Sequence, residues 1–420
     1  MATQALDKAF QLASERYGEL GVDVEGALTA LSAIALSLHC WQADDVGGFE
    51  TSEGELGGGL AVTGNYPGKA RTVEELRADL TMALSLIPGR HRVNLHAIYG
   101  EFGGKKVDRD AIGPEHFAGW IDWARGQGVG LDFNATCFSH PLAADGFTLS
   151  HRDAGVRAFW IEHVKRCREI GAAMGRELGT PAVHNLWIPD GAKDETLDRL
   201  AHRQWLMGSL AAIYAEDHAG EHLKDSVESK LFGIGSEAFV VGSFEFYLAW
   251  ALANKKMICL DMGHFHPTES VADKVGALLL FFPELLFHVS RGLRWDSDHV
   301  VTFNDELRAL MLEIVRARAL SRAHLALDYF DASLNRVGAY VIGARSTMKA
   351  LLYALLEPTA KLREFEADGD NFSRLALLEE MKTLPFGAVW DMHCARAGVP
   401  PAEKWLADVQ LYECRVLQDR

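Results

Sequence analysis

The sequence predicts an α/β fold, a (β/α)8 TIM barrel with N-terminal helices and a C-terminal helical extension. Short apolar runs typical of buried strands alternate eight times with segments of helical periodicity. Charged and imidazole side chains follow the later runs, at the strand ends where barrel enzymes place their active sites. The chain of 420 residues exceeds the usual length of one domain, but barrels of this kind routinely do so.

The expected elements follow one another in a regular order. The eight strands are expected at residues 33–39, 92–96, 130–134, 182–187, 226–231, 257–261, 285–290 and 324–329. Helices are expected at 6–20 and 22–31, before the first strand, and then at 72–86, 114–127, 153–178, 197–216, 243–253, 270–282 and 304–319. Thr72 and Glu75 form a capping box at the start of one helix, and Asn304 is a suitable N-cap for another.

The chain is expected to divide after the eighth strand. Residues 1–335 form the catalytic barrel with its N-terminal helices, and residues 336–420 form a helical extension. Breaks at Pro358, Pro385 and Pro400 leave the extension too few periodic segments for a second catalytic domain, so we expect it to make oligomer contacts. The Gly-rich stretch 47–68 is either a lid over the site or a disordered surface loop.

Composition and charge exclude several classes of function. The 42 Lys and Arg residues against 58 Asp and Glu give a net charge of −16, which would repel the phosphate backbone of a nucleic acid. Residues 1–17 lack the apolar core of a signal peptide, and the longest apolar run, 246–253, is too short to cross a membrane. We therefore expect a soluble cytoplasmic protein. Its six cysteines show no Cys-x-x-Cys spacing, which indicates buried free thiols.

Acidic and imidazole residues gather at the ends of the last four expected strands. They are Glu228 and Lys230 at the fifth, Asp261 and His264 at the sixth, His288, Asp296 and Asp298 at the seventh, and Asp328 and Asp331 at the eighth. Asp296 and Asp298 lie two residues apart, so they point to one side of an extended chain. In a barrel these strand ends meet at one mouth, which would bring the side chains together.

So many carboxylates in one pocket require cations. Five negative charges cannot all persist in a partly dehydrated pocket without opposite charge nearby. Two divalent ions and Lys230 would cancel them. The predicted ligands are Glu228, Asp261, His288 and Asp328 for one ion, and His264, Asp296 and Asp298, with Asp261 shared, for the other. Such oxygen and imidazole donors suit manganese, magnesium or cobalt better than a thiolate-seeking ion.

Six strings of residues agree, in order, with one known family. They are residues 38–45 (LHCWQADD), 63–71 (TGNYPGKAR), 228–235 (ESKLFGIG), 261–269 (DMGHFHPTE), 294–299 (RWDSDH) and 327–333 (LDYFDAS). In these strings the chain resembles bacterial L-rhamnose isomerase, and the resemblance covers nearly the whole chain. It implies a (β/α)8 barrel, a homotetramer, and two divalent metals with Mn²⁺ preferred and Co²⁺, Mg²⁺ or Zn²⁺ as alternatives. It also implies the wider xylose-isomerase-like superfamily, whose Glu-x-Lys and Asp-x-Asp motifs hold the same strand positions.

The same resemblance implies the reaction. The family interconverts L-rhamnose and L-rhamnulose, and we expect a metal-assisted 1,2-hydride shift on the open-chain sugar. One ion would hold the sugar hydroxyls, and the ion bound by Asp298 would polarise the carbonyl group. Lys230 would stabilise the negative charge that develops on O1 of the sugar.

The expected roles of the remaining site residues leave alternatives open. Expected substrate contacts are His96, Trp187, Glu228, Lys230 and Asp331, and expected catalytic residues are Lys230, Asp298 and His96. His96 would open the sugar ring or hold its distal hydroxyls, unless it is a structural core histidine. Trp187 would form an apolar wall of the sugar site or pack in the core. Asp331 would bind a hydroxyl or cap the next helix.

Two weaker motifs indicate other functions. Residues 233–238 imitate the G-x-G-x-x-A dinucleotide fingerprint, but they follow the strand that already bears Glu228 and Lys230. His264 and His266 resemble the His-x-His motif of barrel metallohydrolases, which usually lies on the first strand. A divalent-metal-dependent barrel hydrolase is therefore the alternative function. A catalytically silent sugar-binding protein would lack a ligand position, and every expected position is filled.

Overall fold

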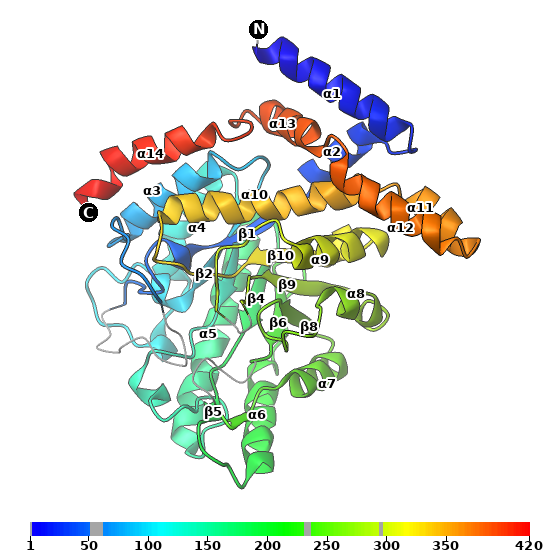
Figure 1. Ribbon diagram of the computed structural model, residues 1–420. Coiled ribbons are helices and arrows are strands. Elements are labelled where there is room, and N and C mark those ends of the chain that lie inside the picture. The colour runs from blue at the N-terminus through cyan, green and yellow to red at the C-terminus, as the bar shows by residue number, and fades with distance from the viewer. Residues whose placement is uncertain (1, 51–61, 231–236, 294–296) are drawn as a thin grey trace.

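Eight parallel strands close into a barrel, and helices surround it (Figure 1). The computed structural model describes residues 2–50, 62–230, 237–293 and 297–420. The barrel strands are β1 (Leu36–His39), β2 (Arg92–His96), β3 (Gly130–Asn134), β4 (Ala182–Leu186), β6 (Leu223–Glu228), β8 (Met257–Asp261), β9 (Leu285–Val289) and β10 (Ala323–Leu327). Their order around the barrel is β1-β10-β9-β8-β6-β4-β3-β2, which confirms the predicted fold class. β5 (Gly191–Ala192) and β7 (Phe239–Val240) form a separate antiparallel pair.

The helices fall into three groups along the chain. The N-terminal helices are α1 (Ala2–Gly18) and α2 (Val24–Ser32). The helices between barrel strands are α3 (Val73–Leu84), α4 (Ala118–Gln127), α5 (Ala154–Leu178), α6 (Arg199–Ile213), α7 (Phe244–Asn254), α8 (Ala272–Leu278) and α9 (Asp305–Arg316). The helices after the last strand are α10 (Arg336–Leu355), α11 (Thr359–Ala367), α12 (Asn371–Glu380), α13 (Phe386–Arg396) and α14 (Trp405–Arg415).

Alternation along the strands separates an apolar from a polar layer inside the barrel. A buried apolar cluster is formed by Val183, Met257, Cys259, Leu286 and Ala326. Asp261 lies two residues after Cys259 on β8, so it points the same way, one layer nearer the carboxyl end. Asn185 and His288 follow members of the cluster on β4 and β9 with the same spacing. The barrel mouth therefore carries a polar layer directly above an apolar one.

Side-chain caps fix the helix starts that the sequence predicts. The Thr72 hydroxyl accepts a hydrogen bond from the Glu75 backbone N–H at 3.2 Å, so α3 begins at Val73. The Glu75 carboxylate accepts from the backbone N–H of Arg71 at 2.7 Å and not from that of Thr72, so only the Thr72 half of the expected capping box forms. Asn304 likewise caps α9 by accepting from the Leu307 N–H at 3.0 Å.

The fifth barrel strand lies three residues earlier than expected, at Leu223–Glu228 and not at 226–231. The first half of this strand contains the charged residues Lys224 and Asp225, and charged residues do not predict a buried strand. Asp225 accepts from both Nε and Nη2 of Arg168, each at 2.9 Å, and from Nζ of Lys256 at 3.2 Å. Arg168 and Lys256 neutralise the negative charge of Asp225, so this buried carboxylate does not prevent the strand from forming.

Several helices are shorter than expected, among them α6, which spans Arg199–Ile213 and not 197–216. The segment 114–127 opens with a 3-10 turn, Pro114–Phe117, before α4 begins. α8 ends at Leu278 and not at 282; residues 279–281 continue as a turn, and Pro283 disfavours helical backbone at the buried Phe282.

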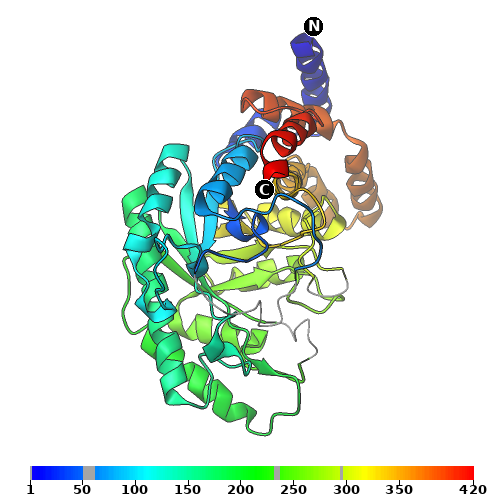
Figure 2. The same cartoon turned by 90° about the vertical axis from the view of Figure 1, so that its left-hand side faces the viewer.

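The C-terminal helices lie together on one side of the barrel. α10 packs against α9, α2 and α3, and most of its side chains are buried. Beyond it, α13 contacts α1, and both views place α1, α13 and α14 outside the barrel (Figures 1 and 2). Across the described ranges, no helix is long and apolar enough to cross a bilayer.

The Gly-rich stretch 47–68 is described only at its two ends. The Phe49 N–H donates to the Ile98 carbonyl at 2.7 Å, and the Tyr66 N–H donates to the Ala332 carbonyl at 2.8 Å. A side chain at Gly64 would collide with the backbone of Ala332, which accounts for a glycine there. Residues 51–61 lie outside the described part of the chain, so the lid stays a prediction. Most of the fingerprint-like segment 233–238 lies outside it too.

Candidate metal centre

Three carboxylates and one imidazole converge at the carboxyl ends of β6, β8, β9 and β10. His288 Nδ1 lies 3.3 Å from Glu228 Oε1, 3.6 Å from Asp261 Oδ2 and 3.1 Å from Asp328 Oδ2. One donor atom from each of the four residues lies within 4.8 Å of the others. The fold thus brings together the four residues expected to share one ion, which we call the four-residue cluster.

In each of the three carboxylates, the oxygen that does not face His288 accepts a hydrogen bond from another residue. The contacts are Asn185 Nδ2 to Glu228 Oε2 (2.5 Å), Trp41 Nε1 to Asp328 Oδ1 (3.1 Å), and Ser290 Oγ and Gly263 N to Asp261 Oδ1 (2.7 and 2.6 Å). Each carboxylate is therefore oriented so that its other oxygen faces the point beside His288 Nδ1. Such supporting contacts commonly fix the ligands of a metal ion.

Sequence reasoning missed these supporting residues. Trp41 follows β1 and Ser290 follows β9, so both lie just past the end of a barrel strand. Asn185 occupies an interior-facing position near the end of β4. Position at a strand end was the available signal, but uncharged side chains there are far less conspicuous than carboxylates.

The cluster has the properties of a cation site. Among the described residues, Glu228 Oε1, Asp261 Oδ2 and both ring nitrogens of His288 are buried and lack a hydrogen bond of good geometry, so close approach to one another is their main polar contact. Buried polar atoms without partners are destabilising unless a ligand satisfies them. Three carboxylate oxygens and an imidazole nitrogen form a donor set typical of a hard divalent ion. The residues present therefore fit a divalent metal.

The pKa values of Asp261, Glu228 and His288 are shifted in ways that indicate a need for positive charge at the cluster. Burial raises the pKa of Asp261 to about 7; His264 opposes this rise, while Glu228 and Asp328 add to it. Burial acts to raise the pKa of Glu228 as well, but the neighbouring His288 and His264 outweigh it and lower that pKa. Burial acts to lower the pKa of His288, and the surrounding Cys259 and Glu228 raise it instead. A divalent ion would supply the positive charge that these groups otherwise draw from protons.

A cavity with aromatic walls opens onto the cluster. Its apolar lining consists of Trp41, Val46, Ala135, Phe138, Trp187 and Phe330. His96 also lines it, with Nδ1 3.1 Å from Thr136 Oγ1 and the ring edge-on to Trp41. Burial, helped by Arg109, lowers the pKa of His96 to about 3, so the imidazole is neutral. His96 and Trp187 thus both lie at the cavity, as their predicted substrate contacts require.

Residues expected to bind the second ion lie at the same cavity. His264 and Asp298 both line it, and His264 Nδ1 is 3.1 Å from Glu228 Oε1. Asp298 has a φ of 44°, in the left-handed region that residues other than glycine rarely adopt. Asp296, the third expected ligand, lies outside the described residues. The second metal site therefore stays a prediction.

Lys230 is held in place by two residues of the same chain. Its Nζ donates to the Pro189 carbonyl at 2.8 Å and forms an ion pair with Glu237. Trp187 lies below, with its ring centre 5.9 Å from Nζ. Contact between Lys230 and a sugar oxygen would require this ion pair to open. Its catalytic role stays a prediction.

The Asp331 carboxylate accepts hydrogen bonds within its own turn. Its Oδ1 accepts from the backbone N–H and the hydroxyl of Ser333, at 2.9 and 2.5 Å. The N-cap of α10 is Asn335, so Asp331 does not cap the next helix. Asp331 is absent from the cavity lining, and its contact with a sugar hydroxyl stays a prediction.

Comparison with known proteins identifies the family. The family model described as L-rhamnose isomerase (RhaA) matches residues 4–420. The chain belongs to the L-rhamnose isomerase family. The L-rhamnose isomerase of Rhodopirellula baltica is 58% identical over 415 residues, covering 99% of this chain and 97% of the relative. The L-rhamnose isomerases of Salmonella typhimurium and Escherichia coli are each 56% identical over 420 residues, covering both chains completely.

Solved structures are more distant. L-ribulose 3-epimerase is 14% identical, with a TM-score of 0.45 over 79% of this chain and 97% of that one. D-allulose 3-epimerase from Methylomonas sp. is 11% identical, with a TM-score of 0.44 over 78% of this chain and 97% of that one.

The L-rhamnose isomerase family consists of metal-dependent isomerases, and the four-residue cluster is suited to a metal ion.

Proposed function

We propose that this protein interconverts L-rhamnose and L-rhamnulose with the help of two divalent metal ions. The observation that carries this proposal is the convergence of three separately held carboxylates on His288 Nδ1 at a barrel mouth. Membership of the L-rhamnose isomerase family over the whole chain supports the choice of substrate. The cavity beside the cluster supports a small polyol as the ligand.

The four-residue cluster would hold one ion, and His264, Asp296 and Asp298 would hold the other. Bound there, the ions would supply Lewis acidity toward the sugar's oxygens. The donor set of oxygens and imidazole nitrogens favours Mn²⁺ over thiophilic ions, with Co²⁺, Mg²⁺ or Zn²⁺ as alternatives.

The protein's own side chains would position the open-chain sugar and exclude water. His96 and Trp187 would contact the sugar, with His96 as a neutral hydrogen-bonding group held by Thr136. Phe138 and Trp41 would cover the apolar side of the cavity. Lys230, released from Glu237, would donate to O1 as negative charge develops there.

Isomerisation moves one hydrogen from C2 to C1 and one proton from O2 to O1. A direct hydride shift needs no carbon base, whereas an enediol route needs a base whose pKa lies near the working pH. The low pKa of His96 makes it a weak base, which favours the hydride shift. We expect a reaction run in D₂O to leave the transferred hydrogen unlabelled. Deuterium at C1 of the product would instead support the enediol.

The decisive test is metal-dependent turnover of L-rhamnose. Protein treated with EDTA should lose activity and regain it when Mn²⁺ is added. Its thermal unfolding temperature should rise with Mn²⁺ as well, because an ion that binds only the folded state stabilises it. Failure of Mn²⁺ to support ketose formation would refute the isomerase.

The barrel hydrolase receives no support from the comparisons. His266, the second histidine of the His-x-His pair, is exposed, and its Nδ1 lies 2.7 Å from Thr268 Oγ1 in its own turn. Hydrolysis of a screening ester or amide would be the result that revives this alternative.

A further inference from the structure

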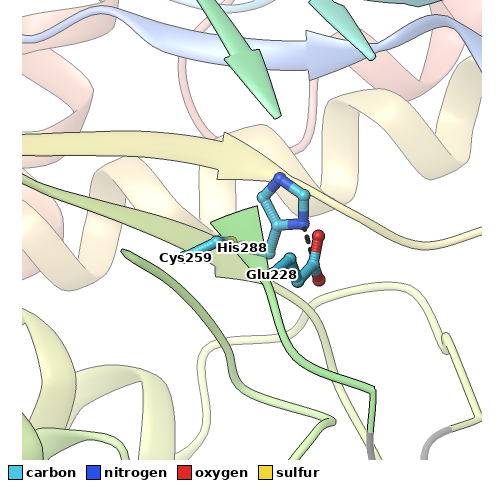
Figure 3. A group of neighbouring side chains, drawn as sticks. All are labelled: Glu228, Cys259 and His288. Atoms are coloured by element: carbon cyan, nitrogen blue, oxygen red, sulfur yellow. Dashed lines mark ion pairs between the residues drawn. The ribbon is translucent and has the colours of Figure 1, made fainter. Parts of the chain in front are cut away.

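A thiol lies beside two members of the four-residue cluster. Cys259 precedes Asp261 by two residues on β8 and faces the same interior of the barrel. One donor atom each from Glu228, Cys259 and His288 lies within 4.8 Å of the others. Figure 3 shows the three side chains next to one another. The polar layer at the barrel mouth therefore has a sulfur donor directly beneath it.

Two of these three residues have buried atoms that no hydrogen bond satisfies. Glu228 Oε1 and both ring nitrogens of His288 are in this state among the described residues, although Glu228 Oε1 and His288 Nδ1 lie 3.3 Å apart as an ion pair; each side chain is 3% exposed. Cys259 itself is fully buried in the apolar layer. A ligand between the layers would reach an oxygen, a nitrogen and a sulfur at once.

We propose that Glu228, Cys259 and His288 form a further site, overlapping that of the four-residue cluster, for a thiophilic divalent ion such as Cd²⁺. Carboxylate, imidazole and thiolate together form a donor set that favours softer ions, whereas the four-residue cluster favours harder ones. Glu228 and His288 belong to both sets, so an ion held through Cys259 excludes one held by the four-residue cluster. A thiophilic ion is then an inhibitor that acts at the barrel interior. This proposal rests on the proposed metal-dependent function.

Binding through Cys259 exchanges a proton for the ion. The S–H bond breaks, a sulfur–metal bond forms, and the proton leaves to solvent, with no change in oxidation state. The ion needs no co-reactant.

The experiment titrates Mn²⁺-loaded protein with Cd²⁺ and follows two signals that do not depend on sugar. The first is the ultraviolet charge-transfer absorption of a cadmium–thiolate bond, and the second is the electron paramagnetic resonance signal of released Mn²⁺. We expect both to rise together, and turnover to fall with them. In Cys259→Ala the absorption should disappear, and the Cd²⁺ concentration that releases half the Mn²⁺ should rise at least about tenfold, a loss typical even of residues that only support a ligand.

Two matched variants control for other thiols. Cys394→Ser changes a buried thiol on α13, and Cys414→Ser changes an exposed one; both should behave like the wild type. Cys259→Ser, close to cysteine in size, repeats the test if the alanine variant is unstable.

Several outcomes would overturn the proposal. One is release of Mn²⁺ by Cd²⁺ without thiolate absorption, and another is persistence of the absorption in both Cys259 variants. A third is loss of Mn²⁺ binding in both variants, which would make Cys259 a support of the four-residue cluster. Absence of any L-rhamnose turnover with Mn²⁺ would refute the proposed function instead, and the two spectroscopic signals would still decide the cadmium site.

Discussion

The contact between Asn185 and Glu228 is the closest that any supporting residue makes with the four-residue cluster. Asn185 Nδ2 lies 2.5 Å from Glu228 Oε2 and leaves Oε1 facing His288. We predict that Asn185→Ala weakens Mn²⁺ binding about 10- to 100-fold, because the freed carboxylate loses its fixed orientation. Titration of metal-free protein with Mn²⁺, followed by electron paramagnetic resonance, measures this change.

The matched control is Asn94→Ala. Asn94 Oδ1 accepts from Asn134 Nδ2 at 2.7 Å, so this variant also breaks a buried hydrogen bond of an asparagine inside the barrel, here with an amide and not with a carboxylate. Asn94 lies on β2, two strands away from β4. Equal losses of Mn²⁺ affinity in the two variants would show that Asn185 acts through general packing and not through Glu228.

Lys230 permits a second prediction at the same scale. We expect Lys230→Met to lower kcat about 100-fold, the typical loss when one donor to a developing oxyanion is removed, while the bound Mn²⁺ is retained. Steady-state kinetics and metal analysis of the purified variant measure both quantities. Lys224→Met, on β6 six residues before Lys230 but paired with Glu284, is the control and should leave kcat unchanged. An unchanged kcat in Lys230→Met would assign Lys230 to its ion pair with Glu237 alone.

At the scale of elements, one carboxylate connects three strands at the amino-terminal end of the barrel. Glu284, which precedes β9, accepts from Lys224 of β6 at 2.5 Å and lies 2.7 Å from Nε2 of His324 on β10. The hydrogen bond with His324, aided by Lys224, lowers the pKa of Glu284 from 4.5 to about 2 although partial burial opposes it. The folded state therefore holds the charged form more tightly than the unfolded state does.

This pKa shift predicts a loss of stability in acid. The contribution of Glu284 is complete above pH 4.5 and disappears as the pH falls toward 2, because the unfolded state then binds the proton first. Glu284→Gln should be less stable than the wild type by about 1 kcal/mol at pH 7, a value that allows for solvent screening. Urea unfolding of metal-free protein at several pH values measures the difference. A difference that stays constant from pH 7 to pH 3 would contradict this assignment.

The sequence predicts elements well where one physical signal dominates. Apolar runs and caps such as Thr72 place most strands and helices within a few residues. The fifth strand is misplaced because Asp225 looks unsuited to a barrel wall until Arg168, distant in the chain, is seen beside it. Likewise, the ligands of the four-residue cluster are conspicuous as charged strand ends, whereas the neutral donors Trp41 and Asn185 become visible only when the barrel closes.

At the scale of the whole molecule, apolar side chains remain exposed on the helices beyond α10. Phe372 and Leu375 of α12 are 83% and 61% exposed, and Leu406 and Leu411 of α14 are also exposed. Neighbouring exposed apolar side chains, such as Phe372 and Leu375 three residues apart on α12, are typical of protein–protein contacts. These exposed side chains support the prediction that the helices after α10 make contacts in a homotetramer. The described contacts of α10 itself are mainly with the barrel helices α9 and α3 and with α2.

The oligomer prediction is tested by charge substitution on α12. We expect the wild type to have the mass of a tetramer by light scattering, and Phe372→Glu to shift it to smaller species, because burying an unpaired carboxylate in an apolar contact is unfavourable. Leu197→Glu changes a residue that is 95% exposed just before α6 and should leave the mass unchanged. Circular dichroism should show folded protein in both variants. Dissociation by Leu197→Glu alone would move the contact to the α6 side of the barrel, and a monomeric wild type would refute the tetramer.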